Sequence, residues 1–154
     1  MRYKQKLNLN KKSETDLAYL AGFVDGEGTL TITSNPNKKE RKNPSKSYRF
    51  IFQVVNTDKE IIDWIASFLG VGFITRRDPR DDGQKNNKIR YILTAGSFDN
   101  VAQICNVLLP YLKVKKPQAQ LILEYYRNHK FRKISTREIE IVKEIRILNK
   151  RGLQ

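Results

Sequence analysis

The sequence predicts an α+β protein in which a four-stranded antiparallel sheet carries helices on one face. Three segments alternate polar with apolar residues, which is typical of strands with one buried side, and a shorter fourth strand follows a pair of glycines. The intervening segments have apolar residues at intervals of three and four, as in amphipathic helices. At 154 residues, 39% of them apolar, the chain suits a single core. We therefore expect one domain over residues 1–154, with the element order α-β-β-α-β-β-α-α.

The first helix is expected over residues 14–25. Ser13, followed three residues later by Asp16, resembles the capping box that starts many helices. From Leu17 to Val24 there is no charged residue at any angle around the helix. We therefore expect this helix to be buried on all sides.

A stripe of small residues runs along this helix, because Ala18, Gly22 and Gly26 recur at every fourth position. Another helix could approach its backbone closely there, and no other segment of the chain has the same character. A second copy of the chain is the simplest partner, which predicts a two-fold symmetric homodimer. The expected interface residues are Ala18, Leu20, Ala21, Gly22, Val24 and Asp25.

Two strands joined by a basic loop are expected next. Residues 29–34 alternate so that Leu30 and Ile32 face the core. Residues 35–47 contain two prolines and five basic residues, and are predicted to form a hairpin loop. Residues 48–55 alternate again, with an apolar side made by Tyr48, Phe50, Phe52 and Val54.

A helix over residues 58–69, capped by Thr57 or Asn56, leads to the second pair of strands. The third strand, about residues 73–76, is too short for its register to be fixed from the sequence. A polar turn is expected over residues 77–87. The fourth strand is expected over residues 88–95, with an inward side made by Ile89, Tyr91 and Leu93.

Three helices are expected to end the chain, over residues 97–109, 117–127 and 135–149. Pro117 is well placed as the first residue of the helix over residues 117–127. Ser135 and Glu138 have the spacing of a capping box at the start of the third. Cys105 lies among apolar residues of the helix over residues 97–109 and is interpreted as a small core residue.

The charge of the chain points to a polyanionic partner. The formal net charge is +14 and the isoelectric point is near 10.0, so attraction to nucleic acid is the leading interpretation. A ribosomal or membrane-surface protein could carry a similar charge. No apolar run approaches the ~20 residues that span a bilayer, and the N-terminus lacks a signal-peptide core. We therefore expect an intracellular protein that binds neither a membrane nor a small-molecule substrate.

The residues available for catalysis are few in type. One cysteine excludes an internal disulfide and a cysteine-based zinc site, and the single histidine, His129, makes histidine-based chemistry improbable. Catalysis, if there is any, would rest on carboxylates and a divalent cation. Of the acids near the end of the first helix, Glu27 is a better ligand candidate than Asp25, because it lies just past the helix without bulky neighbours.

The outward side of the predicted sheet is polar or basic and nearly free of acids. A solvated antiparallel face is the plain alternative, but the basic loops between the strands favour DNA. A two-stranded ribbon fits the major groove, where Arg pairs with guanine and Gln with adenine, while loop lysines hold phosphates. The expected DNA contacts are Thr29, Thr31, Thr33, Asn35, Lys38, Lys39, Arg41, Lys42, Lys46, Ser47, Arg49, Ile51, Gln53, Thr75, Arg77, Lys88, Arg90, Ile92, Lys113 and Lys116.

One stretch carries a family resemblance. The residues Leu20-Ala21-Gly22-Phe23-Val24-Asp25-Gly26-Glu27-Gly28 resemble the signature of the LAGLIDADG homing endonucleases, and the single copy resembles the homodimeric branch of that family. The resemblance extends over nearly the whole chain and implies the αββαββα(α) fold. The alternative is a buried helix followed by an acidic turn.

The resemblance also implies roles for individual residues. Glu27 would coordinate the metal together with the backbone carbonyl of Gly26. Lys115 would stabilise developing phosphate charge or activate water, and Asn56 would orient water. Asp25 is expected to satisfy backbone donors near the helix ends, and some contribution to the metal site is the alternative. The implied cofactor is Mg²⁺, with Mn²⁺ as a substitute and Ca²⁺ binding without supporting cleavage.

Three positions depart from the family pattern. Glu27 stands where Asp is more familiar, and Asn56 stands where Gln is usual. Glu60 replaces a basic residue, which puts part of the pocket network in doubt. Lys115 also has a simpler interpretation, as a phosphate contact in a lysine-rich loop.

The resemblance implies an Mg²⁺-dependent endonuclease that binds double-stranded DNA as a homodimer and cuts both strands of a long pseudo-palindromic target. It also implies an origin in an intron or mobile element, and hence a chloroplast, a mitochondrion or a prokaryotic cytoplasm. A LAGLIDADG-derived RNA maturase or a non-cleaving DNA-binding protein is the main alternative. A basic RNA-binding or ribosomal module is a more distant one.

Overall fold

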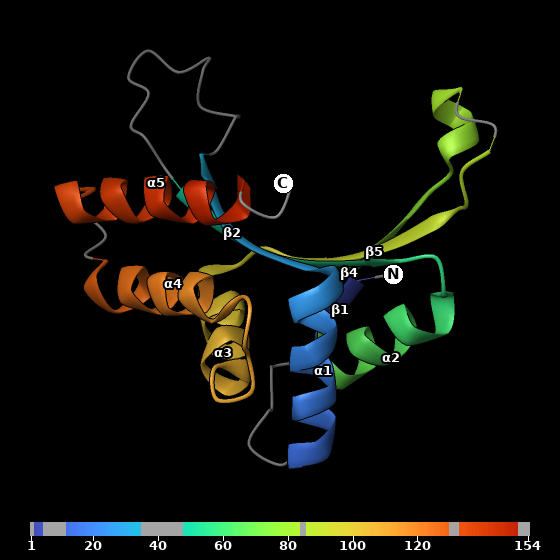
Figure 1. The fold of residues 1–154 in the computed structure, drawn as a ribbon, viewed down its shortest axis with the longest axis horizontal. Helices are drawn as coiled ribbons and strands as arrows, with labels where there is room; N and C mark the ends of the chain where they lie inside the picture. The colour runs from blue at the N-terminus through green and yellow to red at the C-terminus, as the bar shows by residue number, and fades with distance from the viewer. Residues whose placement is uncertain (1, 5–11, 35–47, 84–85, 130–132, 151–154) are drawn as a thin grey trace.

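Every strand in the described part of the chain joins one antiparallel sheet (Figure 1). The computed structural model describes residues 2–4, 12–34, 48–83, 86–129 and 133–150. The predicted α+β class and its four strands are confirmed, and a fifth strand, β1, adds at the edge beside β4. The order across the sheet is β1-β4-β5-β3-β2, with bounds β1 Arg2–Lys4, β2 Gly28–Ser34, β3 Tyr48–Asn56, β4 Val71–Arg77 and β5 Arg90–Ala95.

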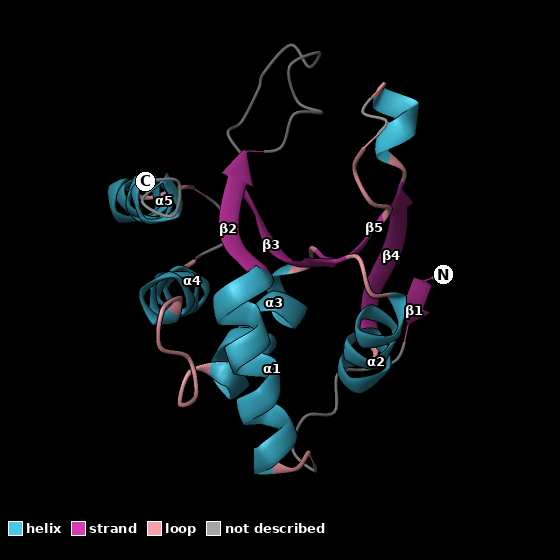
Figure 2. Ribbon diagram, turned by 45° about the vertical axis from the view of Figure 1, so that its right-hand side comes forward, coloured by secondary structure: helices cyan, strands magenta, loops and turns pink. Residues whose placement is uncertain are grey.

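The α-helices leave one side of the sheet open. In Figure 1 and Figure 2 the helices α1 to α4 lie beneath the sheet, and α5 packs against β2. The other side is concave in Figure 2, because the β2–β3 and β4–β5 pairs rise at its two ends. No helix among the described residues is long and apolar enough to cross a membrane. The bounds are α1 Glu14–Glu27, α2 Lys59–Leu69, η2 Pro79–Asp82 (a 3-10 helix), α3 Phe98–Leu108, α4 Lys116–Asn128 and α5 Thr136–Lys150.

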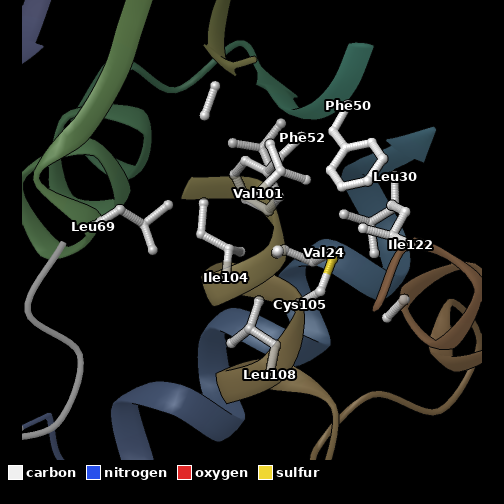
Figure 3. Packing of buried hydrophobic residues seen from close by; sticks show 14 of the residues in the cluster. Val24, Leu30, Phe50, Phe52, Leu69, Val101, Ile104, Cys105, Leu108 and Ile122 are labelled. Carbon is white, nitrogen blue, oxygen red and sulfur yellow. The ribbon is translucent and has the colours of Figure 1, made fainter. Parts of the chain in front are cut away.

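The core lies between the sheet and the helices (Figure 3). Phe50 and Phe52 of β3 have no exposed surface and face Val101 of α3 and the other helices below. Burying a side chain of this size contributes about 1.5–3 kcal/mol. Cys105 belongs to the same core, as predicted, and burial raises the pKa of its thiol to about 12.

Within one copy of the chain, helix α1 has one buried side and one exposed side. Burial on all sides stays a prediction that depends on a second copy. Ala18 and Gly22 are exposed. Leu20, Ala21 and Val24 have 0% exposed surface because they fill the core of their own subunit. Their predicted place in a subunit interface is therefore corrected.

The start of α2 differs from the prediction. Its N-cap is Asp58, whose carboxylate accepts hydrogen bonds from the N–H groups of Glu60 at 2.8 Å and Ile61 at 3.4 Å. The predicted cap, Thr57 or Asn56, is wrong. Asn56 instead accepts a hydrogen bond from the Asp58 N–H at 2.8 Å, so its amide shapes the turn before the helix.

Other ends move by one or two residues. β4 starts at Val71, because pairing with β1 and β5 extends it, and β5 starts at Arg90. α1 continues two residues beyond the prediction, to Glu27. α4 starts at Lys116, which places Pro117 one residue further into the first turn than predicted.

The predicted capping box of α5 is confirmed. The Ser135 N–H donates to Glu138 Oε2 at 2.5 Å, and the Glu138 N–H donates to Ser135 Oγ at 3.2 Å. The same carboxylate is buried and lies 2.5 Å from His129 Nδ1, beyond the end of α4. Burial disfavours the carboxylate, but the Ser135 and His129 hydrogen bonds outweigh burial and lower the pKa of Glu138.

Candidate active site and nucleic-acid interface

The end of α1 places Glu27 at the surface, where the helix turns directly into β2. Gly28 is both the C-cap of α1 and the first residue of β2, and its N–H donates to the carbonyl oxygen of Val24. A Cβ on Gly28 would lie 2.6 Å from that oxygen, so only glycine permits this close turn. Glu27 therefore projects an exposed carboxylate from a fixed backbone.

The carboxylate of Asp25 binds the loop that precedes α4. Its Oδ2 accepts a hydrogen bond from the Lys113 N–H at 2.7 Å, and its Oδ1 accepts one from the Lys115 N–H at 2.8 Å. These bonds confirm the prediction that Asp25 satisfies backbone donors near helix ends. The backbone carbonyl of Asp25 accepts a third bond, from the Lys115 ammonium at 2.7 Å.

Lys115 lies half-buried beside the acids of α1. Burial lowers the pKa of its ammonium group, and the carboxylates of Asp25 and Glu27 act in the opposite direction by favouring the charged form. The structure thus brings Glu27 and Lys115 into one electrostatic neighbourhood, although they are far apart in the sequence.

The oxygen atoms at the end of α1 fit a hard divalent cation. Gly26 lies in the last turn, where backbone carbonyls lack partners within the helix, and a Cβ on it would meet nothing within 4 Å. Mg²⁺ prefers such carbonyl and carboxylate oxygens, and proteins usually hold it by one or two carboxylates together with substrate phosphates and water. Within the described ranges, no three His, Cys, Asp or Glu side chains gather into a metal cluster.

Asn56 and Glu60 lie where β3 gives way to α2. Asn56 is the last residue of β3 and pairs with Tyr91 of β5, while its side chain contacts the turn before α2. Glu60 is exposed in the first turn of α2. The catalytic role of Asn56 and the effect of Glu60 on the pocket stay predictions.

The outward side chains of the strands form rows across the concave face. Residues directly opposite each other in antiparallel strands point to the same side of the sheet. The register aligns Thr29, Gln53, Thr94 and Phe73 in one row across β2, β3, β5 and β4. The rows further out are Thr31 with Ile51, Thr33 with Arg49, Val55 with Ile92 and Thr75, and Arg90 with Arg77.

All the predicted DNA contacts that lie on strands therefore share this face. Lys88, Lys113 and Lys116 are exposed, the first just before β5 and the other two on either side of Lys115. The remaining predicted contacts lie outside the described residues; they are Asn35, Lys38, Lys39, Arg41, Lys42, Lys46 and Ser47.

The central row contains a residue that the sequence analysis did not assign to the face. Phe73 is 44% exposed, and it was missed because the short third strand could not be phased. In the same row the Gln53 Nε2 donates to Thr94 Oγ1 at 3.1 Å. The amide that could read a base is thus already held by its neighbour on the next strand.

A buried carboxylate fixes the far end of the β4–β5 pair. Asp78 is 8% exposed and accepts hydrogen bonds from the guanidinium groups of Arg80, at 2.8 and 2.6 Å, and Arg76, at 3.1 Å. The Arg80 hydrogen bond is the main reason that the pKa of Asp78 lies well below its usual range. This end of the sheet therefore has a defined shape and a positive charge.

Comparison with known proteins identifies the family. The family model described as LAGLIDADG endonuclease matches residues 20–131. DNA endonuclease I-CreI from Chlamydomonas reinhardtii is 30% identical over 114 residues, which cover 74% of this chain and 64% of that protein's length.

Solved structures share the fold. The homing endonuclease I-CvuI, crystallised with its target in the presence of 2 mM Ca, has a TM-score of 0.68 at 22% identity, covering 87% of this chain and 82% of that one. The archaeal intron-encoded homing endonuclease I-Vdi141I, complexed with DNA, has a TM-score of 0.70 at 19% identity, covering 89% and 86%. The matched model spans the acids of α1 and the loop before α4, and the chain belongs to the LAGLIDADG endonuclease family.

Proposed function

We propose that this chain is an Mg²⁺-dependent, site-specific DNA endonuclease that acts as a homodimer and cuts both strands of a long pseudo-palindromic target. The observation that carries the proposal is the place of the Lys115 ammonium, which binds the Asp25 carbonyl at the end of α1, two residues before the exposed Glu27. The polar sheet face begins close by, at Thr29. This arrangement suits a phosphodiester within a duplex, because a carboxylate and an ammonium group lie next to a face that can form hydrogen bonds with DNA.

Glu27 and the Gly26 carbonyl are the groups that would hold the metal. When bound, Mg²⁺ supplies Lewis-acid stabilisation of a phosphate oxygen and lowers the pKa of a bound water. Lys115 would place its positive charge where negative charge develops on the phosphate, and Asn56 would orient water. Mn²⁺ should substitute for Mg²⁺, and Ca²⁺ should support binding with little cutting.

The exposed side of α1 supports the homodimer. Ala18, Gly22 and Gly26 are exposed in the subunit, and a Cβ on either glycine would meet nothing within 4 Å. A second α1 could therefore lie against this stripe and bring two copies of Glu27 to the two strands of one duplex. Cutting would then occur across the minor groove and leave 3′ overhangs. The protein would act inside the cell, in an organelle or a prokaryotic cytoplasm.

The test offers the purified protein a DNA library with a randomised site in Mg²⁺, from which cleaved members are recovered. We expect Glu27→Gln to bind the selected duplex but to lose cleavage, because the amide is a weak metal ligand. Glu14→Gln, at the other end of α1, is the matched control and should cleave as the parent does. The mechanism is wrong if Glu27→Gln cleaves as fast as Glu14→Gln.

A non-cleaving DNA-binding protein or an RNA maturase is the second candidate. It is favoured by Glu60 in place of a basic residue and by the contact of Asn56 with the turn before α2. A library in which no member is cut, although duplexes are retained by the protein, would support the non-cleaving reading. Preference for structured RNA over duplex DNA would support the maturase.

A further inference from the structure

We propose that Asp25 is a positioning residue that holds Lys115 beside Glu27, an inference that rests on the proposed function. The signature contains two acids, of which only Glu27 is exposed. Asp25 is half-buried, and both of its carboxylate oxygens contact backbone N–H groups of the loop before α4. The Asp25 carboxylate therefore uses both of its oxygens to bind the loop before α4.

The loop before α4 depends on Asp25 for its shape. Lys115 is the N-cap of α4 and makes no capping bond with its own side chain. Asp25, from another helix, accepts a hydrogen bond from the N–H of this N-cap residue, and its negative charge suits the N-terminus of α4. By binding the N–H groups of Lys113 and Lys115, it fixes the 112–113 and 114–115 peptide units. Val114, between them, is 67% exposed and contributes little packing.

The same residue aims the lysine side chain. The Lys115 ammonium donates to the backbone carbonyl of Asp25, two residues before Glu27. One residue of α1 thus sets both the backbone and the charged end of Lys115. Replacing the carboxylate by a carboxamide removes one acceptor and brings an NH₂ group against a backbone N–H, so one of the two loop bonds must break.

A double-mutant cycle tests this inference on the duplex recovered from the library. We expect Asp25→Asn to lower the single-turnover cleavage rate by about 10- to 100-fold, the usual effect of losing a group that orients a reacting one. If Asp25 acts through Lys115, the same change on a Lys115→Ala background should alter the rate by less than about 2-fold, because coupled residues are not additive. An equal loss on both backgrounds overturns the proposal.

Metal affinity separates positioning from metal binding. The affinity of the protein–duplex complex for Mn²⁺ should match that of the parent in Asp25→Asn and fall in Glu27→Gln. If Lys115→Ala cleaves too slowly for the cycle to be measured, this comparison of metal affinities is the deciding test. A fall in Asp25→Asn equal to that in Glu27→Gln would make Asp25 a ligand and overturn the proposal.

Ser97→Ala is the control for the effect of losing a helix cap alone. Ser97 caps α3 by accepting a hydrogen bond from the Asn100 N–H at 3.1 Å, and its loss should lower stability without lowering the cleavage rate. If Asp25→Asn and Asp25→Glu both fail to fold, Asp25 belongs to the fold itself and the positioning role is overturned. If the parent cuts no library member, it is the proposed function that fails, and that result is distinct from additivity in the cycle.

Discussion

At the scale of single residues, environment separates the two acids of the signature. Asp25 is turned toward the loop before α4, whereas Glu27 is exposed at the end of the helix. The sequence predicted this division only in part, because it indicates that Glu27 lacks bulky neighbours but does not show that Lys115 lies beside α1. The contacts of Asp25 join residues 88 and 90 positions apart, a separation at which no local pattern is informative.

Thr94 should sharpen the base preference of Gln53. The Thr94 hydroxyl accepts a hydrogen bond from one amide N–H of Gln53. The amide oxygen of Gln53 and its second N–H then remain for the edge of an adenine. We expect Thr94→Val, which keeps the shape but not the acceptor, to weaken discrimination at one pair of symmetry-related bases by about 1 kcal/mol. The measurement is the base distribution among cleaved library members.

The Gln53→Ala variant provides the comparison for this prediction. It should relax the same pair of positions more strongly, and the Thr94→Val/Gln53→Ala double variant should match it. A change at different positions would contradict the coupling of Thr94 to Gln53.

At the scale of elements, the junction of α4 and α5 should respond to acid through Glu138. Its pKa is lower in the folded protein than the ordinary value of about 4.3, so the unfolded chain binds more protons and stability rises with pH in this range. The stabilisation is complete above the ordinary value and is lost as pH falls through the lowered pKa. We expect Glu138→Gln to cost about 1–3 kcal/mol at neutral pH and to flatten the acid dependence.

Urea unfolding between about pH 3 and pH 7 measures both effects of this variant. Glu140→Gln on the same helix is the control, because Glu140 is exposed and should leave the slope unchanged. An acid dependence in Glu138→Gln as steep as that of the parent would contradict the assignment.

The elements also show what could be predicted from sequence. Alternation fixed the inward sides of β2, β3 and β5, and the Ser135–Glu138 spacing located the start of α5. β4 could not be phased, because Val71 to Arg77 mixes both patterns and its register comes from β1 and β5. The three residues of β1 form a strand only through that pairing, which no local pattern reveals.

At the scale of the whole molecule, charge is divided between the two layers. The described strands carry five arginines, one lysine and no acid, whereas α1 carries four acids and no base. Among the described residues, the strands are therefore more positive than α1. Because exposed charges are screened beyond about 8 Å at physiological salt, the position of a charge should affect DNA binding more than the total charge does.

A pair of charge reversals tests this division, since each changes the net charge by the same amount. Arg90 lies on the concave face, and Arg127 is exposed in the last turn of α4 within the helical layer. We expect Arg90→Glu to weaken binding to a fixed, unselected duplex by at least about 10-fold and to reduce the slope of log K against log salt by about 1. Arg127→Glu should change affinity by less than about 3-fold, because Arg127 belongs to the helical layer and salt screens the interaction of its exposed charge with a duplex seated on the concave face. Fluorescence anisotropy over about 50–200 mM salt gives both quantities, and equal losses in the two variants would place the duplex elsewhere than on the concave face.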